Sequence, residues 1–198
     1  MTRPLISFDA EQSCRLLNET YAGHLDAIAA IAAGGTRVRR FATPDKLDRE
    51  QIQRQATLIR FLAITESFST ERLHAEMDKI ISALGHDGVR TMWLEAHQAA
   101  IMGWEKQQTA YTKWLNIPKT EWTDLLVLTQ ARNAAAHGSG RLTWFQQKNE
   151  KTLNALKVNL KRQLIDVTGS RIVLSEEAIE RVAGTCTEFI RSIDATLS

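Results

Sequence analysis

The chain has 198 residues, of which 43% are hydrophobic and 24% are charged, as in an ordinary globular protein rather than a disordered or fibrous one. We expect a single domain over residues 1–198, long enough to bury a core. The formal net charge of +2 does not by itself indicate a nucleic-acid-binding protein.

Targeting and metal-binding patterns are missing from the sequence. The first residues lack the charged-then-apolar pattern of a signal peptide, and no apolar run has the length of a membrane span. The two cysteines, Cys14 and Cys186, show neither metal-ligand spacing nor a disulfide framework. We therefore expect a cytoplasmic protein with no metal ion and no other cofactor.

Helical periodicity covers the first half of the chain. Residues 8–33 are predicted to form a first helix that ends at Gly34 and Gly35. The loop that follows, residues 36–44, carries Arg37, Arg39 and Arg40, which could bind a phosphate backbone or simply be solvated. Further helices are predicted over residues 45–68, 70–84 and 88–115, with Ser69 or Thr70 as the cap between the second and third.

The next predicted helix ends in a group of polar residues. Thr120 is its expected N-cap, and Gly138 is expected just past its last residue as a left-handed C-cap. Arg132, Asn133 and His137 lie near its end, in the order RNAAAH. Because each residue turns a helix by about 100°, Arg132 and His137 are about 140° apart, whereas Asn133 and His137 share a face. This spacing favours a composite cleft that a second helix end completes.

After this helix the sequence becomes basic, and its period then changes. From residue 131 to residue 163 there are seven Lys or Arg residues and one Glu, a net charge of +6, so the rest of the chain carries −4. Residues 163–175 are predicted to form a short β-hairpin around Gly169 and Ser170. Ser175 caps a last helix that extends to about Leu197, and its predicted buried face is an apolar stripe: Ile179, Val182, Cys186, Phe189, Ile190 and Ile193. The concentrated positive charge indicates a phosphate-binding surface, although a solvated helix face would give the same pattern.

The RNAAAHG segment resembles the signature of the HEPN family, which is an Arg followed by four to six residues and a His, usually with a polar residue directly after the Arg. The looser spacing also occurs from Arg90 to His97, but without the adjacent Asn or the trailing glycine. The resemblance implies an all-α helical bundle, here with a short β-hairpin before the C-terminal helix. It also implies a homodimer in which the paired Arg and His line a cleft between protomers.

Many HEPN proteins are metal-independent endoribonucleases, so the resemblance implies that Arg132, Asn133 and His137 are catalytic. His suits proton transfer to and from the ribose and the leaving oxygen, and Arg suits the charge of the phosphorane. The predicted product is a 2′,3′-cyclic phosphate with a 5′-OH, and RNA is the predicted partner. HEPN proteins often carry an acidic–aromatic pair like Glu66-Ser67-Phe68, so Glu66 could orient Arg132 or His137, or instead pair with a surface arginine.

Candidate RNA-binding residues lie around the motif. One candidate is the aromatic side chain of Trp144, which could stack on a base or instead pack in the core or a dimer. The other candidates are basic side chains of two segments: Arg141, Lys148 and Lys151 after the motif, and Arg37, Arg39 and Arg40 in the loop.

Such an enzyme would act as a toxin or as an antiviral-defence effector with an antitoxin or defence-complex partner. Some HEPN toxins have a Tyr two residues after the His, where this chain has Ser139. Two alternatives stay open: a non-catalytic HEPN module that binds RNA, a nucleotide or a protein, and a helical scaffold whose basic surface meets an acidic partner.

Overall fold

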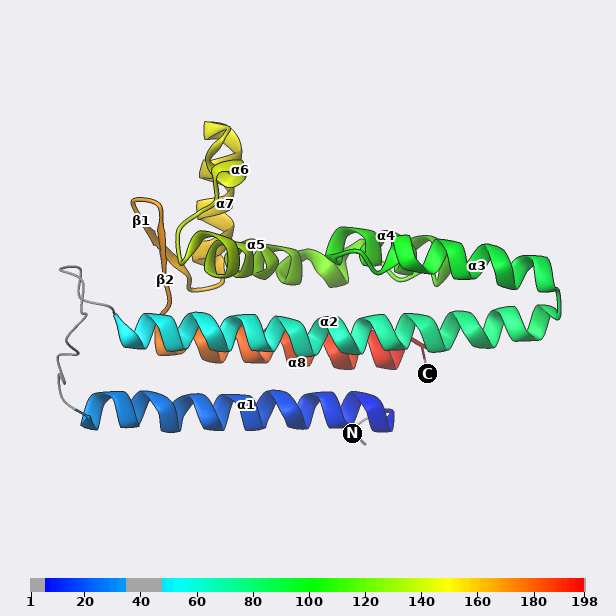
Figure 1. Ribbon diagram of the computed structural model, residues 1–198, viewed down its shortest axis with the longest axis horizontal. Helices are drawn as coiled ribbons and strands as arrows, with labels where there is room; N and C mark the ends of the chain where they lie inside the picture. The colour runs from blue at the N-terminus through cyan, green and yellow to red at the C-terminus, as the bar shows by residue number, and fades with distance from the viewer. Residues whose placement is uncertain (1–5, 35–47, 198) are drawn as a thin grey trace.

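The computed structural model describes residues 6–34 and 48–197 and shows an all-α protein with one β-hairpin (Figure 1). The elements in chain order are α1 (Phe8–Ala33), α2 (Arg49–Leu84), α3 (Asp87–Ala100), α4 (Trp104–Trp114), the 3₁₀ turn η1 (Lys119–Trp122), α5 (Thr123–Gly138), α6 (Trp144–Gln147), α7 (Glu150–Arg162), β1 (Asp166–Thr168), β2 (Arg171–Val173) and α8 (Glu176–Leu197). None of the helices in these described ranges is both long and apolar enough to span a membrane.

The helices form layers around α2 and α8, which lie side by side (Figure 1). Helix α1 packs against both on one side, and α3, α4 and α5 follow α2 on the other. Helices α6 and α7 leave this layer as a projection, which we call the arm (residues 144–162). The predicted apolar stripe of α8 is confirmed, since its members are all buried: Ile179, Val182, Cys186, Phe189, Ile190 and Ile193.

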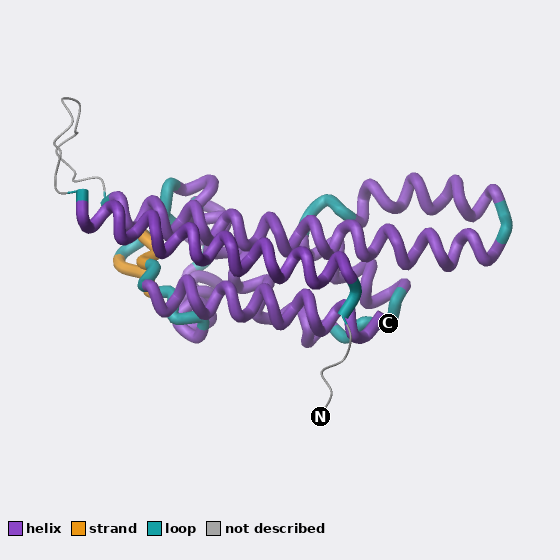
Figure 2. The backbone as a smooth tube through the Cα atoms, turned by 90° about the horizontal axis from the view of Figure 1, so that it is seen from below, coloured by secondary structure: helices purple, strands orange, loops and turns teal. Residues whose placement is uncertain are grey.

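Helix α2 is continuous over 36 residues, so the predicted break at Ser69 and Thr70 is wrong. The Ser69 hydroxyl bonds to the carbonyl of Glu66 and to the side chain of Gln107 in α4, and Gln107 Nε2 donates to Thr70 Oγ1 over 3.0 Å. The hydroxyls that would cap a new helix are therefore used within α2 and by α4. Figure 2 shows the turn from α2 to α3 standing beyond the ends of the other helices.

The helix predicted over residues 88–115 is instead two helices, α3 and α4. The chain breaks between Ile101 and Gly103, and Gly103 has a φ of 109°, which residues with a side chain rarely adopt. The break orients α4 so that Trp104 contacts the aromatic cluster beneath it, 6.3 Å from Trp122 between ring centroids.

The motif helix begins at Thr123, so the predicted N-cap at Thr120 is also wrong. Residues Lys119–Trp122 form the 3₁₀ turn η1, which brings Trp122 into the core. Its ring centroid lies 4.9 Å from Phe189 and 5.2 Å from Tyr111. Burial of this large ring outweighs the capping preference of the threonine.

The β-hairpin is confirmed and is fixed to α2. Strands β1 and β2 pair antiparallel around Gly169 and Ser170, with Thr168 opposite Arg171. Gln51 of α2 bonds to both backbone groups of Leu174, since its Nε2 donates to the carbonyl over 2.6 Å and its Oε1 accepts from the N–H over 3.0 Å. The Ser175 hydroxyl then caps α8 by accepting from the N–H of Ala178 over 3.1 Å, as predicted.

The first and last helices are joined at one end. The backbone N–H and the hydroxyl of Ser7, which caps α1, each donate to a different oxygen of Asp194 over 2.7 Å. Asp194 is fully buried in α8, and Nε of Arg72 in α2 lies 3.3 Å from its Oδ1. One carboxylate thus connects three helices of the bundle.

Replacing Gln51→Ala is expected to destabilise the protein by about 1–3 kcal/mol, because two backbone groups of Leu174 lose their partner. Urea unfolding followed by circular dichroism measures the loss. The control is Gln108→Ala, which removes one longer, exposed bond to the carbonyl of Lys119 and should change stability by about 0.5 kcal/mol or less. Equal stability of Gln51→Ala and wild type would show that the hairpin is not anchored in this way.

Candidate active site at the end of helix α5

The end of α5 is formed by Gly138, Ser139 and Gly140. Gly138 is the last residue of the helix rather than the residue beyond it, so its predicted role as the left-handed cap is wrong. Ser139 adopts that conformation with a φ of 51°, and Gly140 follows with a φ of 84°. The N–H groups of both residues donate to the carbonyl of Ala134, which closes the helix.

The chain beyond α5 is held against β2. The carbonyl of Gly140 accepts from the N–H of Ile172 over 2.9 Å, and the N–H of Leu142 donates to the carbonyl of Ser170 over 2.7 Å. Arg141 forms an isolated bridge with Arg171, and both side chains are exposed. Arg171 therefore adds a cation beside Arg141 that sequence reasoning missed, because only the hairpin register brings the two together.

Arg132, Asn133 and His137 lie within two turns of α5, as predicted. Nη1 of Arg132 donates to Oδ1 of Asn133 over 3.2 Å. Arg132 and Asn133 are half-buried, whereas His137 is exposed. The helix places Arg132 and His137 on different flanks, about 140° apart. Within one protomer a hydrogen bond therefore joins Arg132 to Asn133, while His137 shares the face of Asn133 and lies on a different flank from Arg132.

Glu66 of α2 faces the arginine flank. Burial of Glu66 raises the pKa of its carboxyl above the ordinary value of 4.5, and the nearby Arg132 guanidinium opposes this by lowering it. Of the partners considered for Glu66, Arg132 is the cation that acts on it electrostatically. A half-buried carboxyl of α2 and the motif arginine thus share one environment.

The aromatic candidate Trp144 lies on the arm and is 67% exposed. Its ring contacts Phe145 edge-to-face, with 5.2 Å between centroids, and Nζ of Lys148 lies 5.8 Å from the Trp144 ring centroid. Thr143 and Gln146 form a capping box that begins α6 and aims these two rings outward. Trp144 therefore does not seal the core of the protomer.

Some of the basic candidates lie in the described part of the chain and others lie outside it. Lys148 and Lys151 lie on the exposed arm, and Arg141 lies at the hairpin. Lys161, which contributes to the local charge, is neutralised by Asp166 at 2.5 Å. The other candidates fall outside the described residues: Arg37, Arg39 and Arg40.

The second Arg–His spacing, Arg90 to His97, lies elsewhere on α3. His97 packs against Trp93 and His74, with ring centroids 5.0 Å and 4.8 Å away. Burial and the neighbouring His74 lower the pKa of His97. Its ring thus belongs to an aromatic cluster, whereas that of His137 is exposed. Across the described ranges, no group of three His, Cys, Asp or Glu side chains is arranged to hold a metal ion.

Comparisons of the chain with protein-family models, with curated proteins and with solved structures found no match. The resemblance to the HEPN family consequently depends on the RNAAAHG motif.

The interaction between Glu66 and Arg132 can be measured through the pKa of Glu66. Arg132→Ala removes the charge that favours the carboxylate, so the pKa of Glu66 should rise further above 4.5. NMR titration of the side-chain carboxyl measures this shift. Arg141→Ala removes an arginine from the hairpin side and should leave the pKa of Glu66 unchanged.

Burial of Glu66, which raises its pKa, has a defined effect on stability. Because the folded pKa of Glu66 is raised, the native state binds more protons than the unfolded state, and stability falls as pH rises above 4.5. Glu66→Gln removes this loss. The free energy of unfolding of the variant should therefore increase relative to that of the wild type as the pH rises from 4.5 to neutral. If the difference in free energy of unfolding between variant and wild type is constant over this range, burial does not raise the pKa of Glu66.

Proposed function

We propose that the protein is a metal-independent endoribonuclease of the HEPN type. The observation that supports this best is the arrangement at the end of α5. Arg132 is held by Asn133 and faces a half-buried carboxyl of α2, and His137 stands exposed one turn later. The cations of the arm and the hairpin add a surface that suits a phosphate backbone.

Each residue of the motif has a defined role in this reaction. His137 takes the proton of the ribose 2′-OH, and the 2′-oxygen attacks the phosphorus atom. The bond from phosphorus to the 5′-oxygen breaks, and the leaving oxygen receives a proton. Arg132 binds the extra negative charge of the phosphorane, while Asn133 positions the guanidinium through its 3.2 Å hydrogen bond. The products are a 2′,3′-cyclic phosphate and a 5′-OH.

The separation of Arg132 and His137 on α5 supports a site composed of two protomers. Since the two side chains project from flanks about 140° apart, one helix end does not direct both at one phosphate. A twofold arrangement brings the histidine of one protomer to the arginine of its partner and supplies two histidines for the acid and base roles. The cellular role we propose is a toxin or an antiviral-defence effector in the cytoplasm, controlled by a partner protein.

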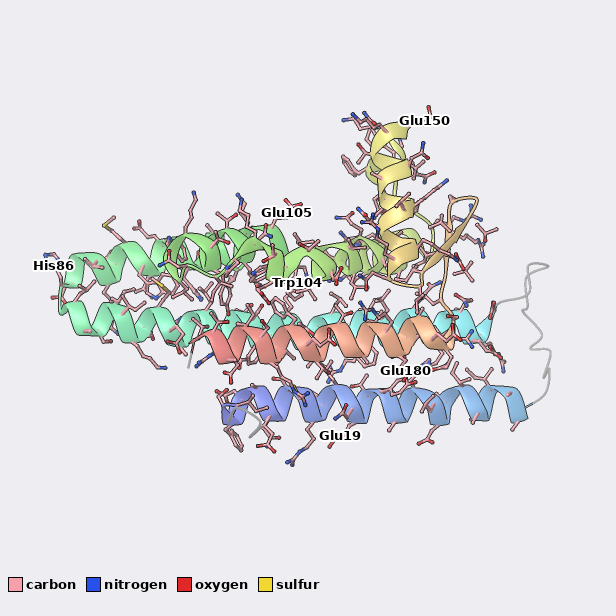
Figure 3. The ribbon with its side chains drawn as sticks, turned by 180° about the vertical axis from the view of Figure 1, so that it is seen from behind. Glu19, His86, Trp104, Glu105, Glu150 and Glu180 are labelled. Carbon is pink, nitrogen blue, oxygen red and sulfur yellow. The ribbon has the colours of Figure 1, made fainter. Side chains whose placement is uncertain are left out.

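Purified protein should cleave single-stranded RNA in EDTA, and His137→Ala or Arg132→Ala should reduce the rate by about 10²–10⁴-fold. A gel assay with analysis of the product ends measures both rate and chemistry. The matched controls are His86→Asn and Arg90→Ala at the far end of the α2–α3 hairpin (Figure 3). His86 caps α3 through its side chain, and Asn keeps a capping oxygen. Cleavage that survives both motif changes, or that needs added metal, contradicts the proposal.

A composite site also predicts complementation between inactive variants. Mixing Arg132→Ala with His137→Ala protein should restore part of the activity, because a mixed dimer retains one intact arginine and one intact histidine. That histidine acts as the base, and water protonates the leaving oxygen in place of the second histidine. Activity measured against the mixing ratio should peak near equal amounts. If each mixture is as inactive as its components while dimers form, the two residues act within one protomer or not at all.

Binding without cleavage would instead favour a non-catalytic HEPN module. The half-buried guanidinium of Arg132 fits this second candidate, since its hydrogen bond to Asn133 and its carboxyl neighbour also give it a structural role. Lack of RNA affinity even at low salt would favour a scaffold subunit that meets an acidic partner.

A further inference from the structure

A groove of about 380 Å³ lies in the corner between α5 and the arm. Its volume is at the lower end of the range of ligand pockets, which is about 300–1,000 Å³. The lining residues come from three helices and include neither an acidic nor a basic side chain: Leu126, Val127, Gln130, Phe145, Gln146, Thr152, Ala155, Leu156 and Asn159.

The groove opens on the same flank of α5 as the motif histidine. At 100° per residue, Leu126, Gln130, Asn133 and His137 fall within an arc of about 60° on α5. His137 follows Gln130 by seven residues, which is about 10 Å along the helix axis. A flexible chain that reaches His137 from this side therefore passes over the groove.

The walls of the groove combine an apolar floor, a free aromatic ring and side-chain amides. Phe145 is 79% exposed and leans edge-to-face on Trp144, so one face of its ring is available. The Gln146 amide is held by the carbonyl of Gln130 at 2.8 Å, which fixes this wall to α5. Planar rings beside amides suit a nucleobase, which stacks through its face and forms hydrogen bonds through its edge.

The rim of the groove is positive. Lys151 and Arg162 lie within about 20° of each other on the side of α7 next to the lining residue Ala155, and Nη1 of Arg162 reaches Asn159 over 3.4 Å. Lys148 adds a third cation beside Trp144. The acid of the arm, Glu150, lies at the outer tip (Figure 3), about 100° around α7 from Lys151. A neutral floor with a cationic rim complements a ligand that is planar in one part and anionic in another.

We propose that this groove binds an unpaired nucleotide of the RNA strand next to the cleavage point. The base stacks on Phe145 over the apolar floor, and the neighbouring phosphates contact Lys148, Lys151 and Arg162. The strand must be unpaired, because in a duplex the base faces are already stacked and paired. That the ligand is RNA rests on the proposed function; the groove itself rests on the arm.

The test is fluorescence anisotropy with a labelled single-stranded RNA of mixed sequence and the same RNA annealed to its complement, in a His137→Ala background that does not cleave it. Phe145→Ala should weaken single-strand binding by about 5- to 150-fold, the worth of one stacked base, and leave duplex binding unchanged. Phe145→Tyr should retain affinity. The matched control is Phe8→Ala, which removes a ring that is 72% exposed on α1.

The outcomes separate the groove from the nuclease. The nucleotide groove is overturned if Phe145→Ala binds the single strand as tightly as its parent, or if it weakens duplex binding as much as single-strand binding. It is also overturned if an acidic peptide displaces the RNA only from protein that retains Phe145. If single-strand binding requires Phe145 but the wild-type protein does not cleave RNA, the groove is supported and the nuclease is contradicted. Cleavage that is unaffected by Phe145→Ala supports the nuclease and defeats the groove.

Discussion

The path of the chain out of α5 is the constraint on which the rest of the site depends. Gly140 has a φ of 84°, and a Cβ atom placed there would lie 2.5 Å from the side-chain nitrogen of Gln55 in α2. The Gln55 amide ends a flexible side chain and could move, so the backbone conformation is the stronger restriction. Since the Gly140 carbonyl also bonds to Ile172 of β2, helix α2, helix α5 and the hairpin meet at this residue.

This junction gives the two flanks of α5 different environments. The flank that faces α2 is half-buried, and there the charge of Arg132 acts on the carboxyl of Glu66. The flank that faces the arm is open, and there His137 is exposed. In the proposed enzyme, charge stabilisation comes from a preorganised group and proton transfer from an accessible one. This division agrees with the general demand that electrostatic catalysis be fixed in advance.

The sequence predicted the parts of this structure that depend on local pattern. The first helix, the hairpin around Gly169 and Ser170, and the buried stripe of α8 follow from periodicity and turn chemistry. The 140° separation of Arg132 and His137 follows from the helix repeat alone.

Predictions failed where a partner distant in sequence decides the local conformation. Ser69 caps no helix because Gln107, 38 residues later, bonds to its hydroxyl. Residue 120 is not an N-cap because Trp122 packs on Phe189. The groove was missed for the same reason, since Leu126 and Phe145 become neighbours only when the arm folds over α5. From its position in the sequence, Glu66 could lie near Arg132, His137 or a surface arginine; in the folded chain Arg132 is the cation that lowers its pKa.

The carboxylate of Asp194 connects Ser7 at the start of α1 to α8, across 187 residues. Because α1 and α2 bury their faces against α8, the core does not close until α8 has emerged from the ribosome. Helix α5 with Arg132 and His137 is synthesised well before that point. A nascent chain therefore carries the motif without the bundle that orients it, and the site is assembled only after α8 has been synthesised.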